Sequence, residues 1–158
     1  MSFNKLSNED QRTFARLCSE RKAAYIYWTR IGKVPEGKDI LIVGDRPGPK
    51  AHQGDDHHHT PFYSKLYSGG WLNAQLTLAG ISERRLMWVN SATWDGKPTD
   101  PAILTAVEWK HIVALGNNAS KWLTKNECQH WKADHPQAHK RFKSSEPYPL
   151  IDFLKQVL

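Results

Sequence analysis

The chain has 158 residues, of which 39% are hydrophobic and 24% charged, and its formal net charge is +6. This length is typical of one domain, so we expect a single domain over residues 1–158 and no second independent core. No stretch approaches the roughly 18 apolar residues of a membrane span, and the N-terminal residues lack the apolar core of a signal peptide. These features predict a cytoplasmic protein without a membrane partner, and the basic balance favours partners that carry phosphate.

Hydrophobic periodicity predicts helices that alternate with strands along the chain. The helices are expected over residues 8–23, 69–80, 101–110, 118–126 and 149–158, and the strands over 38–45, 84–90, 111–117 and 129–136. Pro101 directly after Asp100 is typical of a helix start. The strands are continuous apolar runs, three of them followed at once by Gly or Asn, which favours an α/β fold with a mainly parallel sheet and helices on both faces.

In such a sheet, ligands bind outside the carboxyl ends of the strands. The loop after the first strand begins GDRPG, which places Asp45 and Arg46 at that edge. Asp45 is suited to activate a water or to stabilise a cationic transition state, and Arg46 to bind a phosphate or a carbonyl. The alternative is an Asp–Arg pair that only caps the loop.

Further candidates lie later in the same loop and at the end of the second strand. Phe62 and Tyr63 could stack on a planar base, and Ser68 and Gly69 open a helix whose free N–H groups suit an anion. Asn90 ends the second strand with an amide that carries both a donor and an acceptor, as reading a pyrimidine edge requires. A core aromatic and a local Asn turn are the structural alternatives.

The fourth strand ends at His135, which could donate a hydrogen bond to a carbonyl that gains negative charge. Basic residues around one aromatic then suit a loop that touches DNA phosphates and wedges into a duplex. This segment comprises His139, Lys140, Arg141, Phe142 and Lys143. The alternative is a solvated basic face.

No metal or other cofactor is expected. Cys18 and Cys128 are the two cysteines and form no CxxC motif, so thiols of this chain do not predict a zinc or iron–sulfur site. The tract Asp55-Asp56-His57-His58-His59 carries metal-binding residue types. Adjacent residues rarely converge on one ion, so a His-rich segment over DNA is the preferred interpretation.

Taken in order, these segments resemble the uracil-DNA glycosylase superfamily. The motifs are GDRPG, PF, SGGWL, a strand ending VN, GKPTDP, HIVALGNNASKWL and HP, and they span roughly residues 38–143. They are most similar to the branch that typically holds an iron–sulfur cluster, but the cluster cysteines are absent here. The resemblance implies a three-layer αβα sandwich around a central four-stranded, mainly parallel sheet.

By position, the resemblance also implies site roles. Asp45 would be the catalytic carboxylate and His135 the group that stabilises the 2-keto oxygen of the leaving base. Phe62 would stack on the flipped base, Asn90 would read its edge, and residues 139–143 would insert into DNA. The implied function is flipping of uracil or a modified pyrimidine out of DNA and hydrolysis of its N-glycosidic bond, with a place in DNA repair and no obligate protein partner.

Departures from the family pattern keep two alternatives open. Arg46 replaces a small residue beside the catalytic position, the 55–59 tract is an insertion, and Gln137 stands where the family has a phosphate-contacting Ser. One alternative is a transferase of viral DNA hypermodification, acting in the host cytoplasm, that attaches an amino acid or amine to an activated 5-hydroxymethyluracil. The other is an inactive DNA-binding relative.

Overall fold

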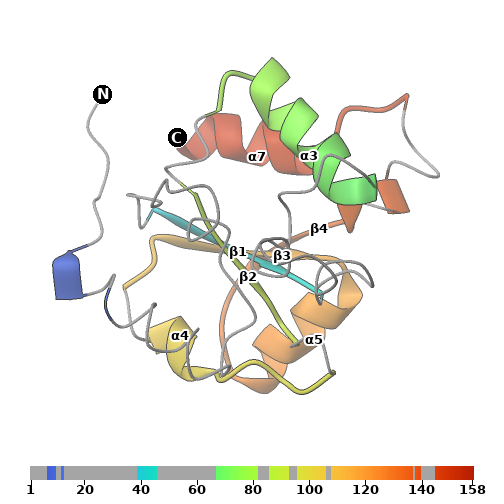
Figure 1. Ribbon diagram of the computed structural model, residues 1–158. Coiled ribbons are helices and arrows are strands. Elements are labelled where there is room, and N and C mark those ends of the chain that lie inside the picture. Colours follow the sequence, from blue (N-terminus) through green and yellow to red (C-terminus); the bar gives the residue numbers. More distant parts are fainter. Residues whose placement is uncertain are drawn as a thin grey trace, which may run out of the picture.

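The computed structural model shows an alternating arrangement of strands and helices (Figure 1). It describes residues 7–9, 12, 39–45, 67–81, 86–92, 96–105, 108–136, 138–139 and 145–158. The elements are β1 (Ile40–Gly44), α3 (Tyr67–Leu78), β2 (Leu86–Asn90), α4 (Ala102–Thr105), β3 (His111–Leu115), α5 (Asn117–Lys125), β4 (Trp131–Ala133) and α7 (Pro149–Val157). Of the helix predicted over residues 8–23, the described residues are Asn8, Glu9 and Arg12, and these are helical.

The four strands form one parallel sheet in the order β2-β1-β3-β4, which confirms the predicted α/β class. Both β1 and β2 are buried along their whole length, as their continuous apolar sequences predicted. The register pairs Gly44 with Asn90 and Leu115 with Ala133, so neighbouring strands end level with one another. The loops that follow therefore start from one edge of the sheet.

Helices cover both faces of this sheet (Figure 1). Alternate strand residues such as Leu41 and Val43 pack with buried side chains of α4 and α5. The intervening residues Ile40 and Ile42 pack with α3 and α7. The alternation follows from the two-residue period of a strand, which sends successive side chains to opposite faces.

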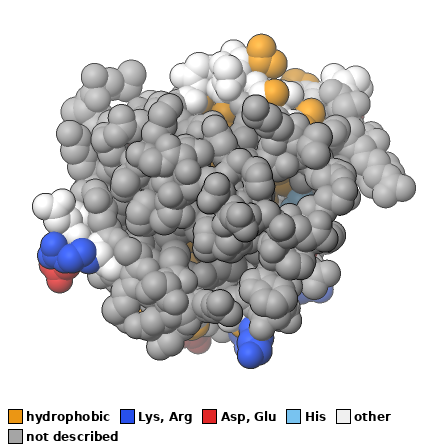
Figure 2. All heavy atoms as spheres, viewed as in Figure 1, with side chains coloured by type: hydrophobic (Ala, Val, Ile, Leu, Met, Phe, Trp, Pro, Cys, Tyr) orange, Lys and Arg blue, Asp and Glu red, His pale blue; other side chains and the backbone are white. Residues whose placement is uncertain are grey.

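Helix α3 buries Leu72 and Leu76 against the sheet, whereas Leu78 is 82% exposed on its outer side. Hydrophobic atoms accordingly gather at the top of Figure 2, above α3. No helix in the described ranges is long and apolar enough to cross a membrane.

Two predicted elements are shorter than expected. The helix predicted over 101–110 begins as expected, because Ala102 N donates to Asp100 Oδ1 at 2.9 Å, but residues 108–110 are not helical. Trp109 Nε1 instead donates to the carbonyl of Ile103 at 3.3 Å, which folds the chain back against α4. The strand predicted over 129–136 is helical again at Pro136, which has no N–H to donate to a neighbouring strand.

A polar contact ties α5 to the segment that leads into β4. Ser120 Oγ lies 2.8 Å from His130 Nε2, and His130 Nδ1 lies 2.8 Å from the carbonyl of Cys128. Because a carbonyl only accepts, Nδ1 donates to Cys128, while Nε2 pairs with the serine hydroxyl. Cys128 itself is a free thiol whose pKa is raised by burial.

Candidate functional site

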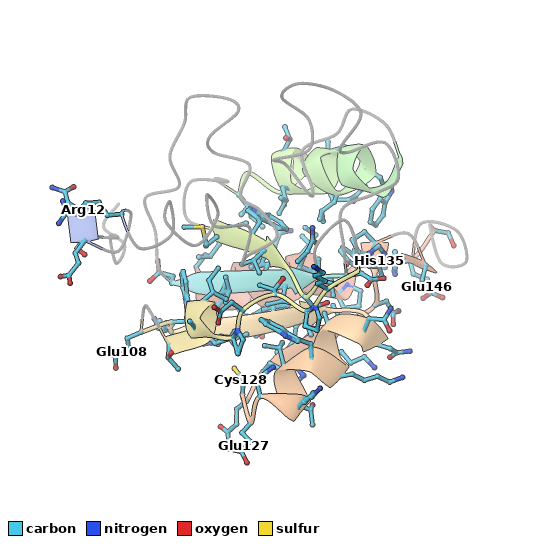
Figure 3. The ribbon with its side chains drawn as sticks, turned by 60° about the horizontal axis from the view of Figure 1, so that its bottom comes forward. Arg12, Glu108, Glu127, Cys128, His135 and Glu146 are labelled. Atoms are coloured by element: carbon cyan, nitrogen blue, oxygen red, sulfur yellow. The ribbon has the colours of Figure 1, made fainter. Side chains whose placement is uncertain are left out.

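The carboxyl edge of the sheet brings together three residues that the sequence singled out. Asp45 directly follows β1, Asn90 is the last residue of β2, and His135 lies two residues after β4. Figure 3 shows His135 at this end of the sheet, while Glu127 and Cys128 lie beyond the far end of α5. Hydrogen bonds connect the segment after β1 to the segment after β2 and to the start of α5.

The backbone at Asp45 is held by the residues that follow β2. The carbonyl of Asp45 accepts hydrogen bonds from Ala92 N at 3.0 Å and from Ser91 Oγ at 2.9 Å. Ser91 N in turn donates to the carbonyl of Gly44 at 2.8 Å. Pairing between the two chain segments thus continues beyond the strands, and it fixes the Cα position from which the Asp45 carboxylate projects.

The half-buried Asp45 side chain meets the first turn of α5. Its Oδ2 accepts a hydrogen bond from Asn118 Nδ2 at 3.1 Å, across 73 positions of sequence. Sequence reasoning missed Asn118, because an asparagine at a helix start is most often a local capping residue. A hydrogen-bonded carboxylate at a sheet edge can accept a proton from water or stabilise developing positive charge.

His135 is half-buried and lies within electrostatic reach of Asp45. Burial lowers the pKa of His135 from its usual 6.5, and the Asp45 carboxylate opposes part of this shift. The imidazole is therefore mainly neutral at neutral pH. A neutral imidazole still offers one N–H donor, which suits a carbonyl oxygen that gains negative charge.

We expect this lowered pKa to make stability depend on pH. The folded protein binds the His135 proton more weakly than the unfolded chain does. The contribution of neutral His135 to the free energy of unfolding is therefore fully present above about pH 6.5, and it is lost as the pH falls toward the lowered folded-state pKa. Denaturant unfolding at pH values of about 8 and about 5 measures this loss. His135→Asn should show a smaller loss than the wild type, and equal losses in both proteins would contradict the assignment.

Gly116, which follows β3, makes room for His135. Its N–H donates to the carbonyl of Ala133 at 2.8 Å, and its φ of 92° with ψ of 178° belongs to a region that is essentially reserved for glycine. A Cβ at this position would lie 3.0 Å from the Cβ of His135. The glycine of VALG was predicted only as part of a strand end, and its contact with His135 depends on β3 and β4 being neighbours.

Asn90 supplies a buried amide at the same edge. The residue is 1% exposed, and its Nδ2 has no hydrogen-bond partner among the described residues. Its backbone carbonyl accepts from Thr99 Oγ1 at 2.6 Å, and Thr99 N donates to the carbonyl of Ser91 at 2.9 Å. A buried unpaired donor costs about 1–3 kcal/mol, and such a donor can serve a ligand acceptor.

Replacing this amide is expected to separate stability from binding. Asn90→Leu removes the unpaired donor while keeping a similar shape, so the free energy of unfolding should rise by about 1 kcal/mol. Urea unfolding measures the change, and the same variant should lose affinity for a single-stranded uracil oligonucleotide. A marked loss of stability would instead indicate that the amide serves the fold.

His139 takes a different place from the one predicted. Its side chain is 1% exposed, with its ring centroid 5.7 Å from that of Trp71 and 4.9 Å from that of Tyr148, and Nε2 lies 2.9 Å from the carbonyl of Glu146. Tyr148 Oη also donates to the carbonyl of Asp134 at 2.6 Å. In this position His139 is a packing residue that braces the segment after β4 against α3 and α7, because aromatic neighbours enclose its ring.

The other predicted site residues divide into two groups. Ser68 and Gly69 lie in the first turn of α3, as the helix prediction required. Outside the described residues lie Arg46, Phe62, Tyr63, Lys140, Arg141, Phe142 and Lys143, together with the 55–59 tract. Their predicted roles stay predictions.

The described edge thus combines a carboxylate, a mainly neutral imidazole and a buried amide with a free donor. This set can stabilise positive charge on one side of a bond and negative charge on the other, and it can recognise a carbonyl oxygen. In comparisons with known proteins, no family model matches the chain, and no curated protein is significantly similar to it.

Proposed function

We propose that this chain is a DNA glycosylase of the uracil-DNA glycosylase type, with the three-layer αβα fold of that superfamily. Its substrate is uracil or a related pyrimidine flipped out of DNA, and its reaction is hydrolysis of the N-glycosidic bond. The observation that carries the proposal is the meeting of the Asp45 carboxylate, the His135 imidazole and the unpaired Asn90 amide at one sheet edge. Carboxylate, imidazole and amide match the two demands of this reaction.

The first demand is charge separation as the bond between C1′ of the sugar and N1 of the base breaks. The bonding electron pair leaves with the base, so the sugar becomes a cation and the base an anion whose charge spreads to its 2-keto oxygen. Asp45 stabilises the sugar cation and accepts a proton from the water that adds to C1′. The His135 N–H donates to the 2-keto oxygen, and the base anion takes its final proton from solvent.

The second demand is recognition of a base outside the duplex. A flipped base is read through hydrogen bonds to its edge and through stacking. The Asn90 Nδ2 donor, buried and without a protein partner, suits a pyrimidine carbonyl. The net charge of +6 favours DNA as the macromolecule that carries the base.

The test is product analysis with defined oligonucleotides. Single-stranded and duplex DNA carrying uracil, and then 5-hydroxymethyluracil, are incubated with the protein, treated with alkali and digested to nucleosides for mass spectrometry. We expect alkali-labile breaks at the modified position together with release of the free base. The Asp45→Asn protein, purified in the same way, controls for a contaminating glycosylase.

Two results would overturn the proposal. Intact strands with a mass gain on the modified nucleoside would identify a transferase that leaves the glycosidic bond in place. Intact strands without any mass change, bound with the same affinity by the wild type and the Asp45→Asn variant, would identify a DNA-binding protein without activity.

A further inference from the structure

The Asp45 carboxylate accepts a hydrogen bond from Asn118, an exposed residue that does not contribute to the packing of α5 on the sheet. Helix α5 is anchored by the buried side chains of Ala119, Trp122 and Leu123, which pack on β1 and β3. Asn118 is exposed at the start of the helix, and its amide donates to Asp45 Oδ2 at 3.1 Å. An exposed hydrogen bond of this kind adds little to the free energy of unfolding. Its partner is the candidate catalytic carboxylate, which suggests a role in the site and not in the stability of the fold.

The neighbouring asparagine provides a comparison within the same turn. Asn117 is also exposed, but its Oδ1 accepts from Lys132 Nζ on β4. The two adjacent side chains are therefore directed to different partners, with the donor end of Asn118 used for a carboxylate and the acceptor end of Asn117 used for an ammonium group. Each amide is oriented by the charge of its partner.

We propose that Asn118 is a positioning residue for Asp45, an inference that rests on the function proposed above. A hydrogen bond to Oδ2 restricts rotation of the carboxylate about its Cβ–Cγ bond. Since the Asp45 backbone is already fixed through Ser91 and Ala92, this second restraint sets the direction in which Oδ1 presents its lone pairs. The Oδ1 edge then faces the sugar and the attacking water in a single orientation.

A kinetic experiment separates positioning from folding. Asn118→Leu keeps the side-chain size but removes the donor, and kcat for excision from a single-stranded uracil oligonucleotide should fall about 10- to 100-fold, the range expected when a reacting group is misplaced by about 1 Å. KM should stay within about twofold, because the amide does not touch the base. The matched control Asn117→Leu should leave both constants unchanged.

A double-variant cycle connects the effect to Asp45. In the Asp45→Asn background, adding Asn118→Leu should produce no further loss of the single-turnover rate, since the carboxylate to be positioned is gone. Independent, multiplicative losses in the two variants would overturn the positioning role. So would a wild-type kcat in Asn118→Leu.

A measurement that does not depend on catalysis tests the contact between Asn118 and Asp45 separately from the proposed glycosylase activity. In a ¹⁵N correlation spectrum, the side-chain amide signals of Asn118 should move in Asp45→Ala, and those of Asn117 should not. If they move while the wild type excises no base, the contact stands but the glycosylase proposal and the catalytic use of the contact both fail. If they do not move although the wild type excises uracil, the glycosylase stands and the positioning role of Asn118 is overturned.

Discussion

Asp45→Asn is expected to lower the rate of base excision by about 10²- to 10⁴-fold, the range contributed by a positioned acid–base group. The substituted amide neither accepts a proton at neutral pH nor carries the negative charge that stabilises a sugar cation. Its oxygen can still accept from Asn118, so the local geometry should persist. The rate is measured under single-turnover conditions on a single-stranded uracil oligonucleotide.

The variant should fold normally. The backbone of Asp45 is held through its carbonyl by Ser91 and Ala92, and neither bond involves the carboxylate. We therefore expect the free energy of unfolding to change by no more than about 0.5 kcal/mol, as for most surface substitutions. Affinity for the uracil oligonucleotide should also be retained, and excision at the wild-type rate would remove Asp45 from the mechanism.

Gly116→Ala is expected to destabilise the protein and to impair catalysis together. The φ of 92° and ψ of 178° cost a residue with a side chain about 1–3 kcal/mol, and the new methyl group would press on the Cβ of His135 at 3.0 Å. Because His135 must yield, we expect kcat to fall about 10- to 100-fold in addition. Urea unfolding and single-turnover kinetics on the same preparation measure the two effects.

Gly80→Ala provides the matched control. Gly80, which follows α3, has a φ of 70°, but no atom lies within 4 Å of the position that its Cβ would occupy. A cost of about 1–2 kcal/mol from the left-handed conformation is expected there, with kcat unchanged. If both glycine variants lose stability while both keep the wild-type kcat, the contact between Gly116 and His135 has no part in catalysis.

Much of the architecture was predictable because its signals are local. The apolar run from Ile40 to Gly44 is typical of a buried strand, and a series of such strands separated by helices indicates a parallel sheet. The periodicity of residues 101–110 did not reveal that residues 108–110 are not helical, where the Trp109 indole donates to the carbonyl of Ile103.

For the site too, some features follow from local sequence patterns and others from the tertiary fold. Asp45, Asn90 and His135 were placed at strand ends from sequence, since polar residues after apolar runs mark the carboxyl edge of a parallel sheet. Whether these residues meet depends on the strand order β2-β1-β3-β4, which no local pattern specifies. The burial of His139 beside Trp71 and Tyr148 could not be predicted either. A histidine among basic residues is expected to be exposed unless its aromatic neighbours in space are known.

Local patterns in the sequence therefore predict the four strands, most of the helices that the structure describes and the three polar residues at the strand ends, because apolar residues at a fixed period are visible among neighbouring residues. The tertiary fold, in contrast, determines that Asn118 binds the carboxylate of Asp45, that Gly116 makes room for His135, and that Asn90 Nδ2 has no partner among the described residues. These features are contacts between segments far apart in the chain, or the lack of one. They depend on the order of the strands in the sheet and on the packing of the helices against its two faces.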